Sequence, residues 1–166
     1  MPGMRNMVII LMGVSGAGKT VVGRLLASAV GWQFYDADDF HPSANIEKMR
    51  RGLPLDDADR QPWLATLRAL VHRCLATSTA AVLACSALKR AYQRHLVVDP
   101  QVRLVYLIAN PDLIRERLLQ RRGHFMPPTL LESQFTTLEE PLDAFWVDAA
   151  LSPMDLVTAI RRHLHI

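Results

Sequence analysis

The chain has little of what a secreted or membrane protein needs. It holds only two cysteines, Cys74 and Cys85, in 166 residues, too few for a disulfide framework. No run approaches the roughly 18 uninterrupted apolar residues of a membrane span. The N-terminus also lacks a basic region followed by a long apolar stretch and a small-residue cleavage site. We therefore expect a cytoplasmic protein without a membrane partner.

Signals for zinc and for nucleic acid are also absent. The six histidines show no ligand spacing with the two cysteines, so we expect no zinc site. The net charge is only +3, and no Lys/Arg cluster with interleaved aromatic residues occurs. We expect no nucleic-acid partner and attribute the excess of basic residues to contacts with phosphates and an acidic substrate.

The strongest motif that is present is a phosphate-binding loop. It follows an apolar run at residues 7–12, opens an amphipathic stretch, and comprises Gly13, Val14, Ser15, Gly16, Ala17, Gly18, Lys19 and Thr20. Glycines allow successive backbone N–H groups to turn toward phosphates, and the following helix directs its positive end at them. We expect this loop to bind a nucleoside triphosphate, with Lys19 at the β- and γ-phosphates and the Thr20 hydroxyl on Mg²⁺.

Apolar runs and helix signals alternate along the chain. The runs predict five strands, at residues 7–12, 33–35, 80–85, 102–108 and 145–147. Periodicity and capping signals predict about seven helices, including ones at residues 18–29, from Pro62 to 74, after Ser86, at 110–121, from a Thr129 capping box, and from Ser152. This alternation favours an α/β fold with a parallel sheet covered by helices on both faces. We expect one domain spanning residues 1–166.

Two carboxylates follow the second predicted strand directly, in Asp36-Ala37-Asp38. Ligands of such sheets bind at the carboxyl ends of the strands. Phosphoryl transfer requires a metal and an oriented nucleophile, so one carboxylate is expected near Mg²⁺ and the other on the acceptor hydroxyl. An acidic loop that only caps a helix is the alternative.

Arginines gather on the helix predicted at 110–121 and just beyond it, before the segment 123–127; they are Arg115, Arg117, Arg121 and Arg122. This pattern is typical of a lid that brings guanidinium groups to transferring phosphate, although a solvated basic face is the alternative. A non-catalytic nucleotide switch is the competing class of function, but the guanine-reading NKxD box of GTPase switches is missing.

Longer strings then occur in a fixed order. They are Asp36-Ala-Asp-Asp-Phe-His41-Pro42, Asn45-Ile-Glu-Lys-Met49, Gly52-x-Pro54-Leu55-x-Asp57-x-Asp59-Arg60-x-Pro62-Trp63-Leu64, Ala84-Cys-Ser-Ala-Leu-Lys89, His124-Phe-Met-Pro127 and Ser133-Gln-Phe-x-Thr-Leu138. In these strings the chain resembles the thermoresistant-type gluconokinases, from the P-loop to about Pro141. Several of the strings are far more specific than a P-loop alone.

This resemblance implies ATP-dependent phosphorylation of D-gluconate at its 6-hydroxyl, giving 6-phospho-D-gluconate. It also implies a three-layer P-loop kinase fold with sheet order 2-3-1-4-5, a helical lid at about residues 115–138, and a homodimer. Shikimate kinase is the nearest enzymatic alternative with this fold.

By the same resemblance, Asp36 would hold Mg²⁺ through water and Asp38 would orient the attacking hydroxyl. Arg60 is expected on the substrate carboxylate, where bidentate guanidinium binding is favourable. The lid residues Arg117 and Arg121 are expected to neutralise charge during transfer, together with Lys19.

Further substrate contacts are expected from Ser86, Lys89, His41 and His124. Lys89 is predicted one turn into a helix and has an exposed lysine as its alternative; each histidine has a structural role as its alternative.

Two further side chains, one aromatic and one a thiol, are expected to have structural roles. Trp63 is interpreted as an anchor at a helix start, with a platform for a sugar as the alternative, and Cys85 as a small buried strand residue, with a nucleophile as the alternative.

The chain departs from the family pattern at two places. Ala37 stands where the family has glycine, and alanine has less backbone freedom. The segment between Pro141 and the fifth predicted strand is short and lacks the expected acidic residue.

Overall fold

A five-stranded sheet lies at the centre of the computed structural model, which describes residues 6–120 and 128–166. Its strands have the order β2-β3-β1-β4-β5, and all four neighbouring pairs are parallel. They are β1 (Val8–Met12), β2 (Gln33–Asp36), β3 (Ala81–Ala84), β4 (Val102–Ile108) and β5 (Phe145–Asp148). The predicted fold class and strand order are confirmed.

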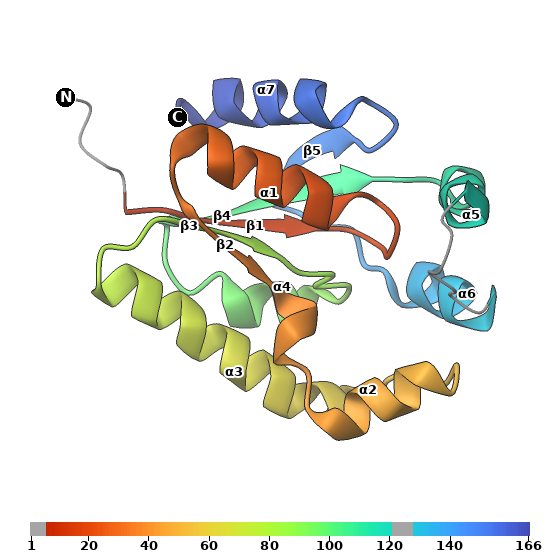
Figure 1. The fold of residues 1–166 in the computed structure, drawn as a ribbon. Coiled ribbons are helices and arrows are strands. Elements are labelled where there is room, and N and C mark those ends of the chain that lie inside the picture. Colours follow the sequence, from red (N-terminus) through yellow and green to blue (C-terminus); the bar gives the residue numbers. More distant parts are fainter. Residues whose placement is uncertain (1–5, 121–127) are drawn as a thin grey trace.

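Helices cover both faces of this sheet (Figure 1). On one face lie α1 (Lys19–Val30) and α7 (Pro153–Leu164), and on the other α3 (Asp57–Ala76) and α4 (Arg90–Leu96). Every residue of β1 is buried: Ile9 and Leu11 join the apolar cluster under α1 and α7, whereas Val8, Ile10 and Met12 join the one under α3. This double burial explains why the strand is a continuous apolar run.

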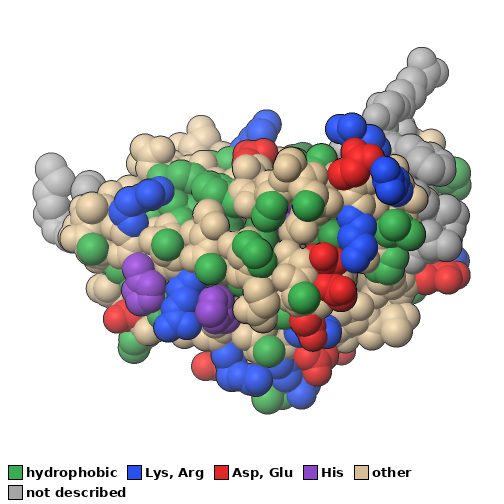
Figure 2. Space-filling model, turned by 90° about the horizontal axis from the view of Figure 1, so that it is seen from below, with side chains coloured by type: hydrophobic (Ala, Val, Ile, Leu, Met, Phe, Trp, Pro, Cys, Tyr) green, Lys and Arg blue, Asp and Glu red, His purple; other side chains and the backbone are tan. Residues whose placement is uncertain are grey.

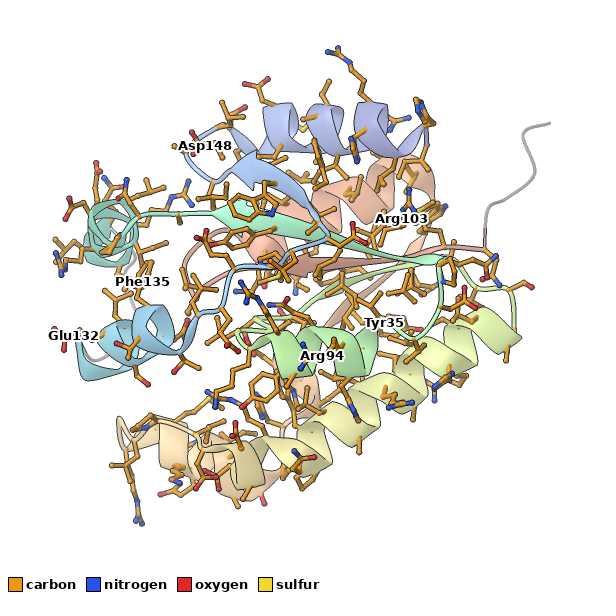
Figure 3. The ribbon with its side chains drawn as sticks, turned by 180° about the vertical axis from the view of Figure 1, so that it is seen from behind. Tyr35, Arg94, Arg103, Glu132, Phe135 and Asp148 are labelled. Carbon is orange, nitrogen blue, oxygen red and sulfur yellow. The ribbon has the colours of Figure 1, made fainter. Side chains whose placement is uncertain are left out.

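The remaining helices lie beyond the carboxyl ends of the strands (Figure 1). They are the 3-10 helix η1 (Ala37–Phe40), α2 (Ser43–Arg50), α5 (Pro111–Gln120) and α6 (Pro128–Thr137). Figure 3 shows Phe135 between α6 and α5, with Glu132 on the outer side of α6. These elements surround the edge of the sheet at which the P-loop lies.

Several predicted boundaries were wrong. The helix predicted from Pro62 begins at Asp57, because Asp56 and Asp59 cap each other: the Asp59 N–H donates to Asp56 Oδ1 at 2.7 Å and the Asp56 N–H to Asp59 Oδ2 at 2.9 Å. Thr129, predicted as a helix cap, lies inside α6. Lys89 immediately precedes α4 instead of lying one turn into it.

Figure 2 views the face over which α3 runs. There the side chains of Lys and Arg are interspersed with those of Asp and Glu. None of the helices in the described residues has the length and apolar character needed to cross a membrane.

Candidate active site

A cavity of about 480 Å³ opens at the carboxyl ends of β1, β2 and β3. One end is formed by the P-loop, and the other by η1, α2 and α3. Its lining includes Ser15, Gly16, Gly18, Lys19, Thr20, Asp36, Asp38, His41, Arg60, Trp63, Ser86, Ser133 and Gln134. The structure thus brings most of the predicted site residues together around one space.

The P-loop has the backbone shape that phosphate binding requires. Gly16 and Gly18 have φ angles of 85° and 101°, a region that other residues rarely adopt. Lys19 opens α1, and its Nζ donates to the carbonyls of Gly13 and Val14, both at 2.9 Å. Backbone N–H groups and a lysine at a helix N-terminus fit the phosphates of a nucleoside triphosphate.

The two predicted Mg²⁺ ligands are in direct contact. Thr20 Oγ1 donates to Asp36 Oδ2 at 2.8 Å, although 16 residues separate the pair. The other carboxylate oxygen of Asp36 accepts from the Asp38 N–H at 3.0 Å and caps η1. Asp36 therefore caps η1, and its second oxygen and the Thr20 hydroxyl also form a set of hard oxygen donors that suits Mg²⁺ beside phosphates.

The alanine that replaces the family glycine causes no strain in this loop. Ala37 is buried in the cluster under α3, and its φ is not positive. Its carbonyl accepts from Trp63 Nε1 at 2.7 Å. Trp63 therefore anchors α3 to η1, although it lies inside α3 and not at its start as predicted, and it also lines the cavity.

Arg60 lies at the end of the cavity that η1, α2 and α3 form, opposite the P-loop. Its Nη1 donates to the Tyr92 hydroxyl at 3.3 Å, and its guanidinium lies 5.6 Å from the centre of the Tyr92 ring. Tyr92 in turn donates to Asp57. These contacts orient Arg60. Since Arg60 lines the cavity, its planar cation is available there for a carboxylate.

Lys89 has a protein partner. Its Nζ lies 2.8 Å from Asp57 Oδ1, and this hydrogen bond raises the lysine pKa and lowers that of Asp57. Lys89 is not among the residues that line the cavity. Its contact with the substrate stays a prediction.

Arg117 also lies away from the main cavity. Its Nη1 donates to the carbonyls of Gly16 and Ala17, at 3.2 and 3.0 Å, and its Nη2 to the Ala149 carbonyl. The guanidinium therefore supports the P-loop from outside. The predicted Arg121 and His124 lie outside the described residues.

Two residues of this site were not predicted from the sequence. The Gln134 side-chain oxygen accepts from the Ser15 N–H of the P-loop at 2.5 Å, and Asn45 contacts His41. Both stand in the family strings, but no local spacing indicated their partners. Cys85 is buried as expected, but it lies one residue beyond the end of β3; burial raises the pKa of its thiol to about 12.

Comparison with known proteins agrees with this geometry. A family model described as shikimate kinase matches residues 15–142. A probable gluconokinase from Xenopus tropicalis is 48% identical over 151 residues, which cover 81% of this chain and 80% of that protein. A gluconokinase from Gluconobacter oxydans is 45% identical over 142 residues, with 85% and 80% covered.

A solved structure is similar over nearly the same length. The crystal structure of a gluconokinase from Sinorhizobium meliloti 1021 has a TM-score of 0.84 and 36% identity, with 97% of each chain covered. The likeness therefore extends over the P-loop, η1, α3 and the sheet that joins them.

Proposed function

This chain belongs to the gluconokinase family, and we propose that it transfers the γ-phosphoryl group of ATP to the 6-hydroxyl of D-gluconate. The observation that carries the proposal is the single cavity whose lining joins the P-loop to Asp38 and Arg60. A phosphate donor, an acceptor hydroxyl and a carboxylate each find a matching group in it.

At the phosphate end, the residues hold the donor. N–H groups of the P-loop would bind the phosphates, and Lys19 would exchange its carbonyl contacts for the β- and γ-phosphates. Thr20 and Asp36 would hold Mg²⁺, which supplies positive charge beside the phosphates. Arg117 keeps the loop in shape through the Gly16 and Ala17 carbonyls, and its catalytic role stays a prediction.

The end formed by η1, α2 and α3, called the acid end because it would bind the substrate acid, holds the acceptor. Arg60 would bind the carboxylate, and Asp38 would accept or orient the proton of the attacking hydroxyl. Ser86 and His41 line the same cavity and would bind other hydroxyls. Most of the rate enhancement would then come from positioning and charge neutralisation in a site from which water is excluded.

Other features of the proposal rest on the family resemblance. We propose that residues 1–166 act as one kinase domain with a lid at about 115–138 that carries Arg121 and His124. A homodimer and a cytoplasmic location belong to the same proposal.

ADP release from MgATP tests the proposed function. Gluconate, shikimate, nucleoside monophosphates and no acceptor are compared side by side. Release that requires gluconate, with 6-phosphogluconate as product, is the expected result. Release that requires shikimate would reassign the acceptor, and acceptor-independent or absent release would indicate a nucleotide switch.

A further inference from the structure

The buried amide of Asn45 has no role in the reaction described so far. Asn45 lies on α2 with an exposed fraction of 4%. Its Nδ2 donates to the Asp59 carbonyl at 2.9 Å and lies 3.2 Å from His41 Nδ1. The carbonyl can only accept a hydrogen bond, so this contact fixes which end of the amide is the NH₂ group.

The amide orientation determines the tautomer of His41. An NH₂ group can only donate, so Nδ1 of His41 is the acceptor and carries no proton. The proton of the neutral ring is therefore on Nε2. Within residues 6–120 and 128–166, no protein acceptor is hydrogen-bonded to Nε2, which leaves this N–H available at a wall of the cavity.

The ring itself is held from other sides. It stacks on Trp63 with ring centroids 4.4 Å apart and planes 8° apart. The His41 backbone N–H donates to the Asp38 carbonyl at 3.5 Å. His41 is thus held next to η1, and it lines the same cavity as Asp38 and Arg60.

We propose that Asn45 is a positioning residue that holds His41 as the Nε2–H tautomer, and that His41 donates this N–H to a hydroxyl oxygen in the middle of the acid's carbon chain. The inference rests on the proposed function for the identity of the acid. In this proposal the Asn45–His41 pair recognises one hydroxyl group that is at neither end of the substrate.

The charges around His41 favour a neutral donor. Arg60 and Asp59 lie on α3, Lys48 on α2, and Asp38 on η1. Burial, and then the positive charge of Arg60, lower the pKa of His41 to about 4. The ring stays neutral near pH 7, where a neutral N–H donor matches an uncharged hydroxyl and leaves the carboxylate to Arg60.

Nitrogen NMR of the substrate-free protein tests the tautomer without any enzymatic reaction. Two-bond ¹H–¹⁵N correlations of His41, assigned by their loss in His41→Asn, are expected to show a protonated Nε2 and an unprotonated Nδ1 at pH 7. A protonated Nδ1, or a mixture of tautomers, would overturn the proposal. This measurement stands even if gluconate proves not to be the substrate.

A pair of substitutions tests the donor in turnover. His41→Gln places an amide N–H near the position of Nε2, whereas His41→Asn places one near Nδ1. The gluconate KM is expected to rise about tenfold in His41→Asn, the order of one lost hydrogen bond, and clearly less in His41→Gln, with the ATP KM unchanged in both. Equal effects of the two variants would overturn the assignment.

Gluconate analogues that each lack one hydroxyl locate the contact. The unmodified enzyme is expected to discriminate about tenfold against one mid-chain analogue, and His41→Asn to lose that discrimination. Asn45→Ser should raise the gluconate KM alone and add nothing in the His41→Asn background, because both remove one contact. Additive effects, or discrimination that survives in His41→Asn, would contradict the proposal.

Discussion

The two ends of the cavity are built in different ways. The phosphate end comes from one continuous segment, residues 13–20, and works mainly through backbone groups and one lysine. The acid end is assembled from η1, α2, α3 and α4 through hydrogen bonds of side chains: Trp63 and Asn45 donate to the backbone carbonyls of Ala37 and Asp59, and Arg60 donates to the Tyr92 hydroxyl. In the proposed function, phosphate binding thus depends on one local segment, whereas acceptor recognition depends on a network of contacts among several helices.

The two ends are expected to respond differently to amino-acid substitution. A backbone loop binds phosphate whatever acceptor lies opposite, so the loop alone does not determine the acceptor. A network of side chains changes its preference when one member changes. We therefore expect substitutions at the phosphate end to affect turnover with every acceptor, and those at the acid end to affect gluconate selectively.

Removing Lys19 is expected to have the largest effect. Lys19→Met should lower kcat about a thousandfold, the upper range for losing one preorganised charge stabiliser, because the transferring phosphate loses its cation. Steady-state kinetics measures the change, and circular dichroism checks the fold. Arg103→Met is the matched control: Arg103 is exposed and lies on β4 near the end of the sheet opposite Asp148 (Figure 3). A fall below tenfold would contradict the role of Lys19.

Asp38→Asn tests where the two ends meet. We expect kcat to fall about a hundredfold or more, the range for general-base catalysis, with ATP affinity within twofold of the original. The matched control is Asp39→Asn, whose exposed side chain is not part of the cavity lining. Equal loss of turnover and ATP affinity would place Asp38 with the donor and remove its role on the hydroxyl.

Arg60→Ala tests the acid end alone. The gluconate KM should rise about ten- to a hundredfold, since a charged hydrogen-bonding partner is lost, while ATP binding measured by calorimetry stays intact. Tyr92→Phe removes only the hydroxyl that contacts Arg60, so a smaller rise is expected. Arg68→Ala on the same helix is the control. Unchanged gluconate kinetics in Arg60→Ala would move the carboxylate site elsewhere.

Trp63→Phe measures how strongly the network supports η1. The change keeps an aromatic ring for His41 but removes the N–H that donates to the Ala37 carbonyl. A loss of at least about 1 kcal/mol in unfolding free energy is expected, because the Ala37 carbonyl loses its donor and the smaller ring leaves space in a buried cluster; urea denaturation measures it. A fully stable variant would show that η1 is held by other contacts.

The smallest expected effect is in pH dependence. The pKa of His41 is lowered from 6.5 to about 4, so between these values the unfolded chain binds more protons than the folded one. Stability should therefore fall as pH decreases through this window, and His41→Gln should make that part of the profile flatter. Thermal unfolding between pH 7 and 4 measures this, and an unchanged slope would contradict the shift.

The sequence predicted some elements better than others for a physical reason. Strand β1 and the P-loop follow from local spacing, and both were located correctly. The start of α3 was placed too late, because the apolar period begins at Trp63 while the helix begins with the polar capping pair at Asp56 and Asp59. Lys89 was placed inside a helix, but Ala87 has a φ of 43° and α4 begins only at Arg90.

By itself the sequence determined the alternation of strands and helices, the phosphate loop and the two carboxylates after β2, because each depends on residues close together in the chain. Only the tertiary structure decided that Lys89 contacts Asp57, that Arg117 supports the P-loop, and that Asn45 sets the tautomer of His41. Side-chain direction depends on partners distant in sequence, and their proximity is set by the packing of α2, α3 and α4 around the sheet.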